Sequence, residues 1–190
     1  IGNGKIYKIG KYLKDKNLPG VALFLGDGTE ELVGAELRRG FGDNDINVVH
    51  SQVVSDISIE SITQTAFQLP PATDVVVGIG GGKALDFAKY SAHLLRLPFV
   101  SVPTSTSNDG FCSPTSSLTV GGRRKTVKSS IPFGVVIDLD VIRSCPPVFF
   151  YSGLGDMVSK ITALADWKEA ANRKLERYSD FASMLAYNSL

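Results

Sequence analysis

VVVGIGGGKALDFAKY, residues 75–90, is the stretch of sequence that decides the fold. Its apolar beginning predicts a buried strand over Asp74–Ile79. Three consecutive glycines follow, and Lys83–Leu95 then has the three-and-four spacing of apolar residues that is typical of a helix with one buried face. A strand that turns through glycines directly into a helix is typical of a strand–helix–strand unit, in which the strands are parallel.

The same alternation continues on both sides of this stretch. Short apolar runs predict four further strands, and amphipathic segments between them predict two further helices. The predicted strands are Val21–Leu25, Ile46–Val49, Phe99–Val102 and Gly134–Ile137, and the predicted helices are Thr29–Arg39, with Thr29 as a candidate cap, and Ser58–Gln68. We therefore predict an α/β fold, namely a Rossmann-like parallel sheet with helices on both faces.

The pattern changes twice in the second half of the chain. Two short segments, Ser116–Val120 and Lys125–Ser129, flank two glycines and two arginines and predict a β-hairpin. Beyond Pro146 the pattern becomes helical, over Ser159–Arg177 and again over Asp180–Leu190. We therefore expect an α/β domain over residues 1–146 and the beginning of an all-helical C-terminal domain over residues 147–190. Both ends look trimmed, so we expect a fragment of a longer protein.

The composition argues against nucleic acid and membranes as binding partners. The chain has 190 residues and a formal net charge of +1, which predicts no bulk attraction to nucleic acid or to an anionic membrane. No apolar run approaches the ~20 residues of a membrane span. The two cysteines, Cys112 and Cys145, lack metal-binding or redox spacing, so we expect free thiols and a cytoplasmic protein.

Glycines follow two of the predicted strands. At Gly80, Gly81 and Gly82 the backbone can approach a pyrophosphate at the start of a helix, although a plain tight turn would use the same residues. Asp27, between two glycines, either binds the ribose hydroxyls of an adenosine or bonds its own backbone in a turn.

Hydroxyl and carboxylate side chains supply the other candidates. The loop Pro103–Gly110 is rich in Ser and Thr and contains Asp109. Its hydroxyls suit a phosphate or the nicotinamide amide, and the carboxylate suits substrate hydroxyls. The alternative is a simple turn rich in Ser and Thr. Asp156 either caps a helix or binds a divalent metal. Four basic residues of the predicted hairpin are either solvated or attract a phosphate, with Lys128 as the favoured phosphate contact; they are Arg123, Arg124, Lys125 and Lys128.

In their order and spacing, these segments resemble the iron-containing alcohol dehydrogenase and dehydroquinate synthase-like superfamily, and within it the glycerol-1-phosphate dehydrogenases. The resemblance rests on GGGK (residues 80–83) with Asp86, VPTSTSNDG (102–110), Ser113-Pro114, Ile137-Asp138, GLGD (153–156) and DWK (166–168).

The resemblance implies a site of three parts. The resemblance implies that NAD or NADP is bound by Gly82, Lys83, Asp86, Thr104, Ser105 and Ser107, helped by Ser113 and Asp27. To these the glycine turn and the basic hairpin add Gly80, Gly81 and Lys128 as expected cofactor contacts. Asp109 would hold the substrate, and Asp156 would contact the substrate and act in catalysis as a ligand of a divalent metal, zinc in the first place or else iron or nickel. The family completes its metal site with two histidines of a helical domain, and we expect neither His50 nor His93 to serve as one.

The implied function is NAD(P)- and metal-dependent interconversion of dihydroxyacetone phosphate and sn-glycerol 1-phosphate, of which this chain would be the N-terminal portion, inactive alone. The partner would be a small phosphorylated polyol, without nucleic acid or membrane, in a protein that could form a homo-oligomer. The alternatives are a glycerol dehydrogenase, a dehydroquinate synthase-like enzyme and a non-catalytic nucleotide-binding fragment.

Overall fold

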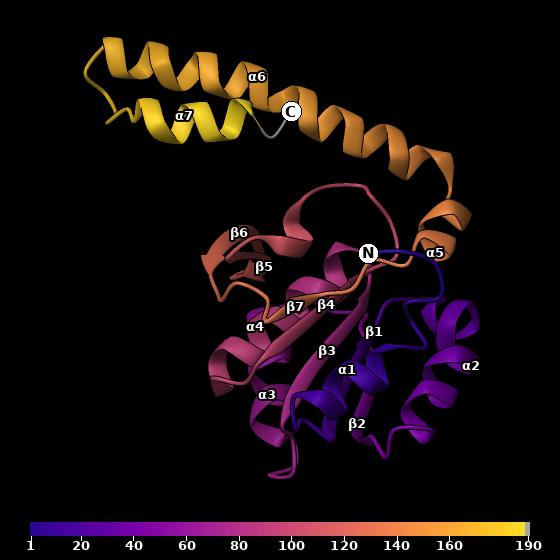
Figure 1. Cartoon of the computed structure of the whole chain (residues 1–190). Coiled ribbons are helices and arrows are strands. Elements are labelled where there is room, and N and C mark those ends of the chain that lie inside the picture. The colour runs from indigo at the N-terminus through magenta and orange to yellow at the C-terminus, as the bar shows by residue number, and fades with distance from the viewer. Residues whose placement is uncertain (189–190) are drawn as a thin grey trace. The chain divides into compact units, whose positions relative to one another are not determined.

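The computed structural model describes residues 1–188 and divides the chain into two compact units (Figure 1). The first unit comprises Ile1–Ser105 and Asp109–Cys145, and the second comprises Thr106–Asn108 and the chain from Pro146 onward. Among the described residues, no helix is both long and apolar enough to cross a membrane.

A five-stranded parallel sheet forms the centre of the first unit, in the order β2-β1-β3-β4-β7. Its strands are β1 (Gly20–Leu25), β2 (Asn47–Val53), β3 (Val75–Gly80), β4 (Phe99–Pro103) and β7 (Gly134–Val135). The three inner strands β1, β3 and β4 are fully buried, as their continuous apolar runs predict. The strand order reverses direction between β1 and β3, which makes this boundary the topological switch point of the sheet.

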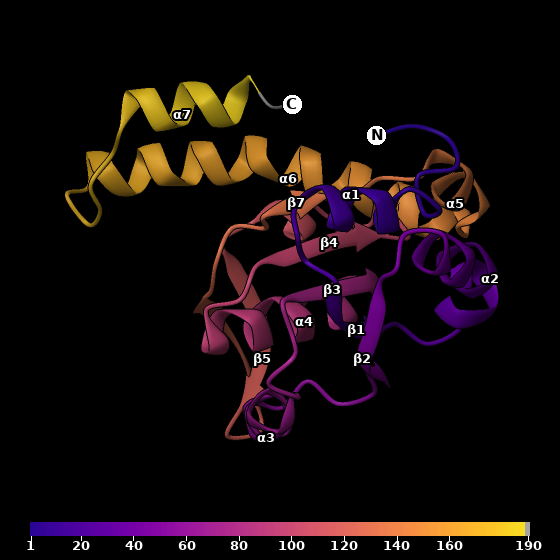
Figure 2. The same cartoon turned by 60° about the horizontal axis from the view of Figure 1, so that its bottom comes forward.

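Helices cover both faces of this sheet (Figures 1 and 2). Along β1, Val21, Leu23 and Leu25 pack into one core, while Ala22 and Phe24 pack into the other. The first core is closed by α1 (Ile9–Asp15), α2 (Thr29–Gly42) and α5 (Leu139–Ser144), and the second by α3 (Ile59–Gln68) and α4 (Gly82–Leu95). The predicted α/β fold is confirmed.

The hairpin consists of β5 (Thr115–Val120) and β6 (Arg123–Lys128). Its turn contains only Gly121 and Gly122, whose φ angles of 56° and 75° are both left-handed. A two-residue turn of this kind requires positive φ at both positions, which glycine adopts without strain. The prediction of a hairpin is confirmed, but the two arginines expected in its loop belong to β6.

The first core also contains a very close helix crossing. A Cβ atom added at Gly10 of α1 would lie 2.1 Å from the Gly40 carbonyl oxygen, and one added at Gly40 of α2 would lie 2.1 Å from the Tyr7 carbonyl oxygen. The backbones of the two segments are therefore in contact, and only glycine fits at these two positions.

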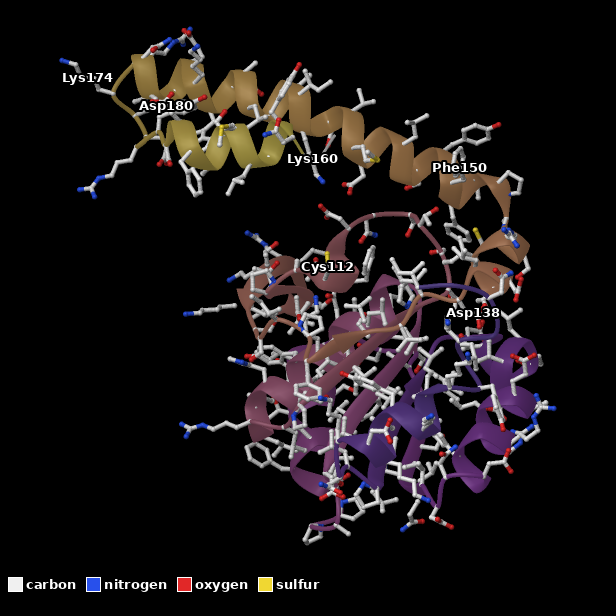
Figure 3. All side chains as sticks on the ribbon, in the orientation of Figure 1. Cys112, Asp138, Phe150, Lys160, Lys174 and Asp180 are labelled. Carbon is white, nitrogen blue, oxygen red and sulfur yellow. The ribbon has the colours of Figure 1, made fainter. Side chains whose placement is uncertain are left out.

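Asp138 joins the beginning of the first unit to its end. Its carboxylate is buried and accepts hydrogen bonds from the backbone N–H of Ile6 at 2.9 Å and of Asp140 at 3.0 Å, the second of which caps α5 (Figure 3). Nearby, the Gly2 N–H donates to the Ile137 carbonyl and the Leu139 N–H donates to the Gly2 carbonyl, each at 3.1 Å. The motif Ile137-Asp138 therefore has a structural role in this unit.

Three details of the first unit differ from the predictions. Thr29 does not cap α2, because the cap is Gly28, with φ of 68° and no side-chain hydrogen bond. Strand β2 extends to Val53, so His50 lies within the strand rather than at its end. The short helices α1 and α5 were not predicted at all.

The second unit contains α6 (Pro147–Asn172) and α7 (Asp180–Tyr187), which pack against each other as a helical hairpin (Figure 1). The rings of Trp167 and Tyr178 pack at a tilt of 53° with centroids 4.7 Å apart, and the Trp167 indole N–H donates to the Arg177 carbonyl at 2.8 Å. The predicted helix over Ser159–Arg177 was misplaced, because α6 begins earlier, with a proline in its first turn, and ends earlier. The last two residues of the predicted helix Asp180–Leu190 lie outside the described residues.

Candidate functional site

Three of the predicted segments meet at the carboxyl edge of the sheet. The Gly26 N–H, just beyond β1, donates to the Ile79 carbonyl at 2.8 Å, and the Thr104 N–H, just beyond β4, donates to the Gly80 carbonyl at 3.1 Å. The turns after β1, β3 and β4 are therefore neighbours at the switch point. Ligands of open α/β sheets bind in the crevice at this place.

The glycines of this edge have two different physical tasks. Gly80 has φ of 146°, and a Cβ atom there would lie 3.0 Å from the backbone of Gly26, so Gly80 is needed for the two turns to pack. Gly81 has an ordinary extended φ of −82°, is exposed, and would place a Cβ atom with nothing within 4 Å. The fold does not require glycine at position 81, and its missing side chain leaves open space in front of a helix.

That helix, α4, begins at Gly82, and Gly81 is its N-cap without a side-chain hydrogen bond. The first N–H groups of a helix have no acceptor within the helix, and the helix dipole makes this end electropositive. Backbone amides with open space before them form an anion site that suits a phosphate. Lys83, in the first turn, is exposed and adds positive charge.

Three further predicted cofactor contacts border this edge. Thr104 and Ser105 follow β4 and are partly buried. Asp27 is exposed after β1. Within the described residues its carboxylate accepts no hydrogen bond, and the turn is closed by the Thr29 N–H and the Gly26 carbonyl, so the interpretation as a turn aspartate bonded to its own backbone is wrong.

Asp86 and Ser113 lie in a hydrogen-bonded network around a buried lysine, Lys89. The Lys89 ammonium donates to the carbonyls of Gly110 and Thr115, both at 2.7 Å, and lies 3.4 Å from the Asp86 carboxylate and from the Ser113 hydroxyl. The second Asp86 oxygen accepts from the backbone N–H of Ser117 at 3.1 Å. That Asp86 and Ser113 also contact a cofactor stays a prediction.

Burial is the largest cause of the pKa shifts of Asp86 and Lys89. It raises the pKa of Asp86 and lowers the pKa of Lys89, while their mutual attraction opposes both shifts. The Arg124 guanidinium of β6 also lowers the pKa of Asp86. Sequence reasoning missed Lys89, although a lysine three residues after an aspartate beside an apolar helix face was a signal for a buried pair.

The remaining polar candidates of the first unit are accessible. Asp109 is exposed and precedes a 3₁₀ turn, Gly110–Cys112, in which the Cys112 N–H donates to the Asp109 carbonyl at 3.2 Å (Figure 3). Lys128 is exposed at the end of β6, opposite Thr115. Within the described residues Cys112 and Cys145 form no disulfide, as expected.

The second unit contains Ser107 and Asp156. The Ser107 carbonyl accepts from the Ser152 hydroxyl at 3.1 Å, and a Cβ atom at Gly153 would lie 1.8 Å from the Thr106 carbonyl oxygen, so Gly153 lets α6 contact this loop. Asp156 lies inside α6 and is partly buried, so the interpretation as a helix cap is wrong.

The described residues do not by themselves fit a metal ion. No three His, Cys, Asp or Glu side chains among them come together as a ligand set. His93 bonds the Ser130 hydroxyl at 2.9 Å through Nδ1. His50 packs on Phe24 with ring centroids 5.5 Å apart, and its buried Nε2 atom has no hydrogen-bond partner.

Comparison with known proteins decides the family. The chain matches the family model described as iron-containing alcohol dehydrogenase over residues 1–146. The chain belongs to the iron-containing alcohol dehydrogenase family. The resemblance inferred from GGGK, VPTSTSNDG and the segments after them is therefore confirmed.

Curated relatives of this family refine the match. The chain is 36% identical to the glycerol-1-phosphate dehydrogenase [NAD(P)+] of Metallosphaera sedula, over 98% of this chain and 53% of the relative. It is 32% identical to the enzyme of the same name from Sulfurisphaera tokodaii, over 100% of this chain and 54% of the relative. The chain thus spans about half the length of these relatives.

Solved structures share the fold. A glycerol dehydrogenase from Schizosaccharomyces pombe superimposes with a TM-score of 0.74 and 28% identity, covering 84% of this chain and 41% of that one. A sulfoacetaldehyde reductase from Bifidobacterium kashiwanohense, solved in complex with NAD+, superimposes with a TM-score of 0.70 and 19% identity, covering 84% and 49%. The second likeness concerns the fold alone.

Proposed function

We propose that this chain is the nucleotide-binding portion of an NAD(P)- and metal-dependent dehydrogenase that interconverts dihydroxyacetone phosphate and sn-glycerol 1-phosphate. The observation that carries the proposal is the open space at Gly81, where the fold does not need glycine and a bound pyrophosphate does. The family and the similarity to glycerol-1-phosphate dehydrogenases support the reaction.

In this proposal the cofactor lies along the carboxyl edge of the sheet. Gly80, Gly81, Gly82 and Lys83 hold its pyrophosphate through amides and charge, and Asp27, whose carboxylate is unbonded within the described residues, accepts from the ribose hydroxyls. Thr104, Ser105, Ser107, Ser113, Asp86 and Lys128 are the proposed contacts of the remaining part. When bound, the nicotinamide supplies the hydride chemistry.

The residues proposed for substrate and metal are carboxylates. Asp109 is accessible and accepts a hydrogen bond from a substrate hydroxyl, and Asp156 supplies one oxygen ligand to a divalent metal. The described residues provide no complete ligand set, so in this proposal the remaining metal ligands come from outside residues 1–188. The substrate is a small phosphorylated polyol. That Cys112 and Cys145 form no disulfide within the described residues supports a location in the cytoplasm. A homo-oligomer stays a prediction.

Calorimetric titration with NADH and with NADPH tests the cofactor part of the proposal. We expect saturable binding at one site with a Kd on the order of 1–100 µM for at least one of them, in the range of ordinary enzyme–cofactor affinities. The ratio of the two affinities decides the cofactor preference. Absence of binding to both at millimolar concentration would contradict the proposal.

Asp109→Ala tests the substrate part. We expect the affinity of the NADH-bound chain for dihydroxyacetone phosphate to fall by at least about 10-fold, since one hydrogen bond to a charged group contributes about 1.5–3 kcal/mol. The affinity for NADH itself stays unchanged, because the nucleotide is bound by other residues. Fluorescence of bound NADH reports both. Asp15→Ala, an exposed aspartate at the end of α1, is the control, and equal loss of both affinities in Asp109→Ala would refute the assigned role.

A further inference from the structure

The Lys89 side chain is fully buried, with a relative exposed area of 0%. Lysine is almost never buried to this extent unless its charge is paired, because leaving water is costly for an ammonium group. Lys89 belongs to α4, the helix that begins at the glycine turn, and its side chain contacts the segment that follows Asp109.

The hydrogen bonds of Lys89 go mainly to backbone rather than to side chains. Its two shortest bonds, both 2.7 Å, are to the carbonyl oxygens of Gly110 and Thr115. The Asp86 carboxylate and the Ser113 hydroxyl lie further away, at 3.4 Å. An ammonium group has three N–H donors, and these four oxygens account for all of them. Lys89 is therefore not available as an acid, a base or a substrate contact.

The two carbonyls mark both ends of one short segment. Gly110 follows Asp109 directly, and Thr115 is the first residue of β5. Within the segment, the Cys112 and Ser113 N–H groups close only short turns, at 3.2 and 3.3 Å, and no residue of Gly110–Cys112 is buried. Phe111 of the segment is only partly buried, and the Ser129 N–H donates to the Pro114 carbonyl at 2.8 Å. The ammonium group of Lys89 adds the hydrogen bonds that attach the segment to α4.

The helix connects this attachment to the glycine turn. Gly82 and Lys89 belong to the same helix and are about 10 Å apart along its axis at 1.5 Å per residue. We infer that Lys89 is a positioning residue, which fixes the Asp109 carboxylate at a set place relative to the nucleotide end of α4 by holding the carbonyls of Gly110 and Thr115. A shift of about 1 Å in the position of such a carboxylate is enough to lower the rate of a reaction about 100-fold. The inference rests on the proposed function for the roles of Asp109 and the glycine turn.

Hydrogen exchange in the whole chain tests the attachment. Lys89→Met keeps the length of the side chain and removes its donors, and we expect amide exchange in residues 110–117 to become at least 10-fold faster, with little change in β1. Lys14→Met, which removes an exposed ion pair with Asp45, is the matched control and leaves this segment unchanged. If Lys89→Met fails to fold, Lys89→Gln, which retains one donor group, is measured in its place and shows a smaller acceleration. Unchanged exchange in the folded variant overturns the inference.

A double-mutant cycle separates positioning from general stability. Lys89→Met lowers the affinity of the NADH-bound chain for dihydroxyacetone phosphate by at least about 10-fold, as Asp109→Ala does, and the double variant loses no more than either alone. The affinity for NADH falls less than the affinity for dihydroxyacetone phosphate, because the glycine turn is intact and only the proposed cofactor contacts Asp86 and Ser113 lose the neighbouring ammonium group. Additive losses, or a parallel loss of NADH affinity, overturn the inference. If the unmodified chain binds no NADH, the proposed function fails, whereas the exchange experiment still decides whether Lys89 holds the segment.

Discussion

Gly81→Val lowers the affinity of the chain for NADH by at least about 100-fold while the fold stays intact. The valine meets no protein atom within 4 Å of its Cβ, and the extended backbone at position 81 suits a β-branched residue. The added side chain instead occupies the space before α4 and keeps a phosphate from the helix amides. Loss of two hydrogen bonds to a charged group, each contributing about 1.5–3 kcal/mol, corresponds to the expected factor.

Gly42→Val is the matched control for this substitution. Gly42 also has open space at its Cβ position, but it lies at the other end of α2, away from the carboxyl edge of the sheet. Calorimetry with NADH and circular dichroism are measured on both variants. An unchanged NADH affinity in folded Gly81→Val would remove the phosphate site from α4, and equal losses in both variants would show that the effect is not local.

Gly40→Ala is expected to lower the free energy of unfolding of the first unit by about 3 kcal/mol, at the upper end of the usual cost of overpacking. Its new methyl group would lie 2.1 Å from the Tyr7 carbonyl oxygen, and because that neighbour is backbone, no side chain can rotate away. The α1 segment must therefore move off α2, which opens the core around Ile9 and Leu13. Urea denaturation measures the change.

Gly42→Ala, two residues further along the same helix, is the control for the crossing. Nothing lies within 4 Å of its Cβ position, and alanine is a better helix former than glycine. We expect a change of a few tenths of a kcal/mol in the stabilising direction. Equal effects of the two substitutions would mean that α1 does not press on α2 at Gly40.

The sequence was informative where local pattern and burial coincide. The strands β1, β3 and β4 are continuous apolar runs because both of their faces are covered, and the amphipathic spacing of α4 reports its single buried face. The glycine turn was found for a related reason, since an unbroken run of glycines between a strand and a helix is typical of backbone that something else must approach closely.

What was missed depends on contacts that the sequence does not display. The helix α1 is only seven residues long, and its placement depends on the contact between Gly10 and Gly40. Residues 152–156 were expected just before a helix, since glycine is a poor helix former. They lie inside α6, where the missing side chain of Gly153 leaves room for the Thr106 carbonyl. The spacing of Asp86 and Lys89 was a signal for the pair, but the main partners of Lys89 are two carbonyl groups, which no residue type reveals.

The hydrogen bonds of Gly2 and Ile6 with residues 137–139 hold the start of the chain beside the end of the first unit. Such a unit suits circular permutation, because Gly2 is hydrogen-bonded to Ile137 and Leu139, only a few residues before the end of the unit at Cys145. New termini at the exposed turn of Gly121 and Gly122 would leave every strand of the five-stranded sheet uncut. A permuted first unit with one reporter group on each new terminus, at the turn of the hairpin, could thus serve as a sensor for the nucleotide.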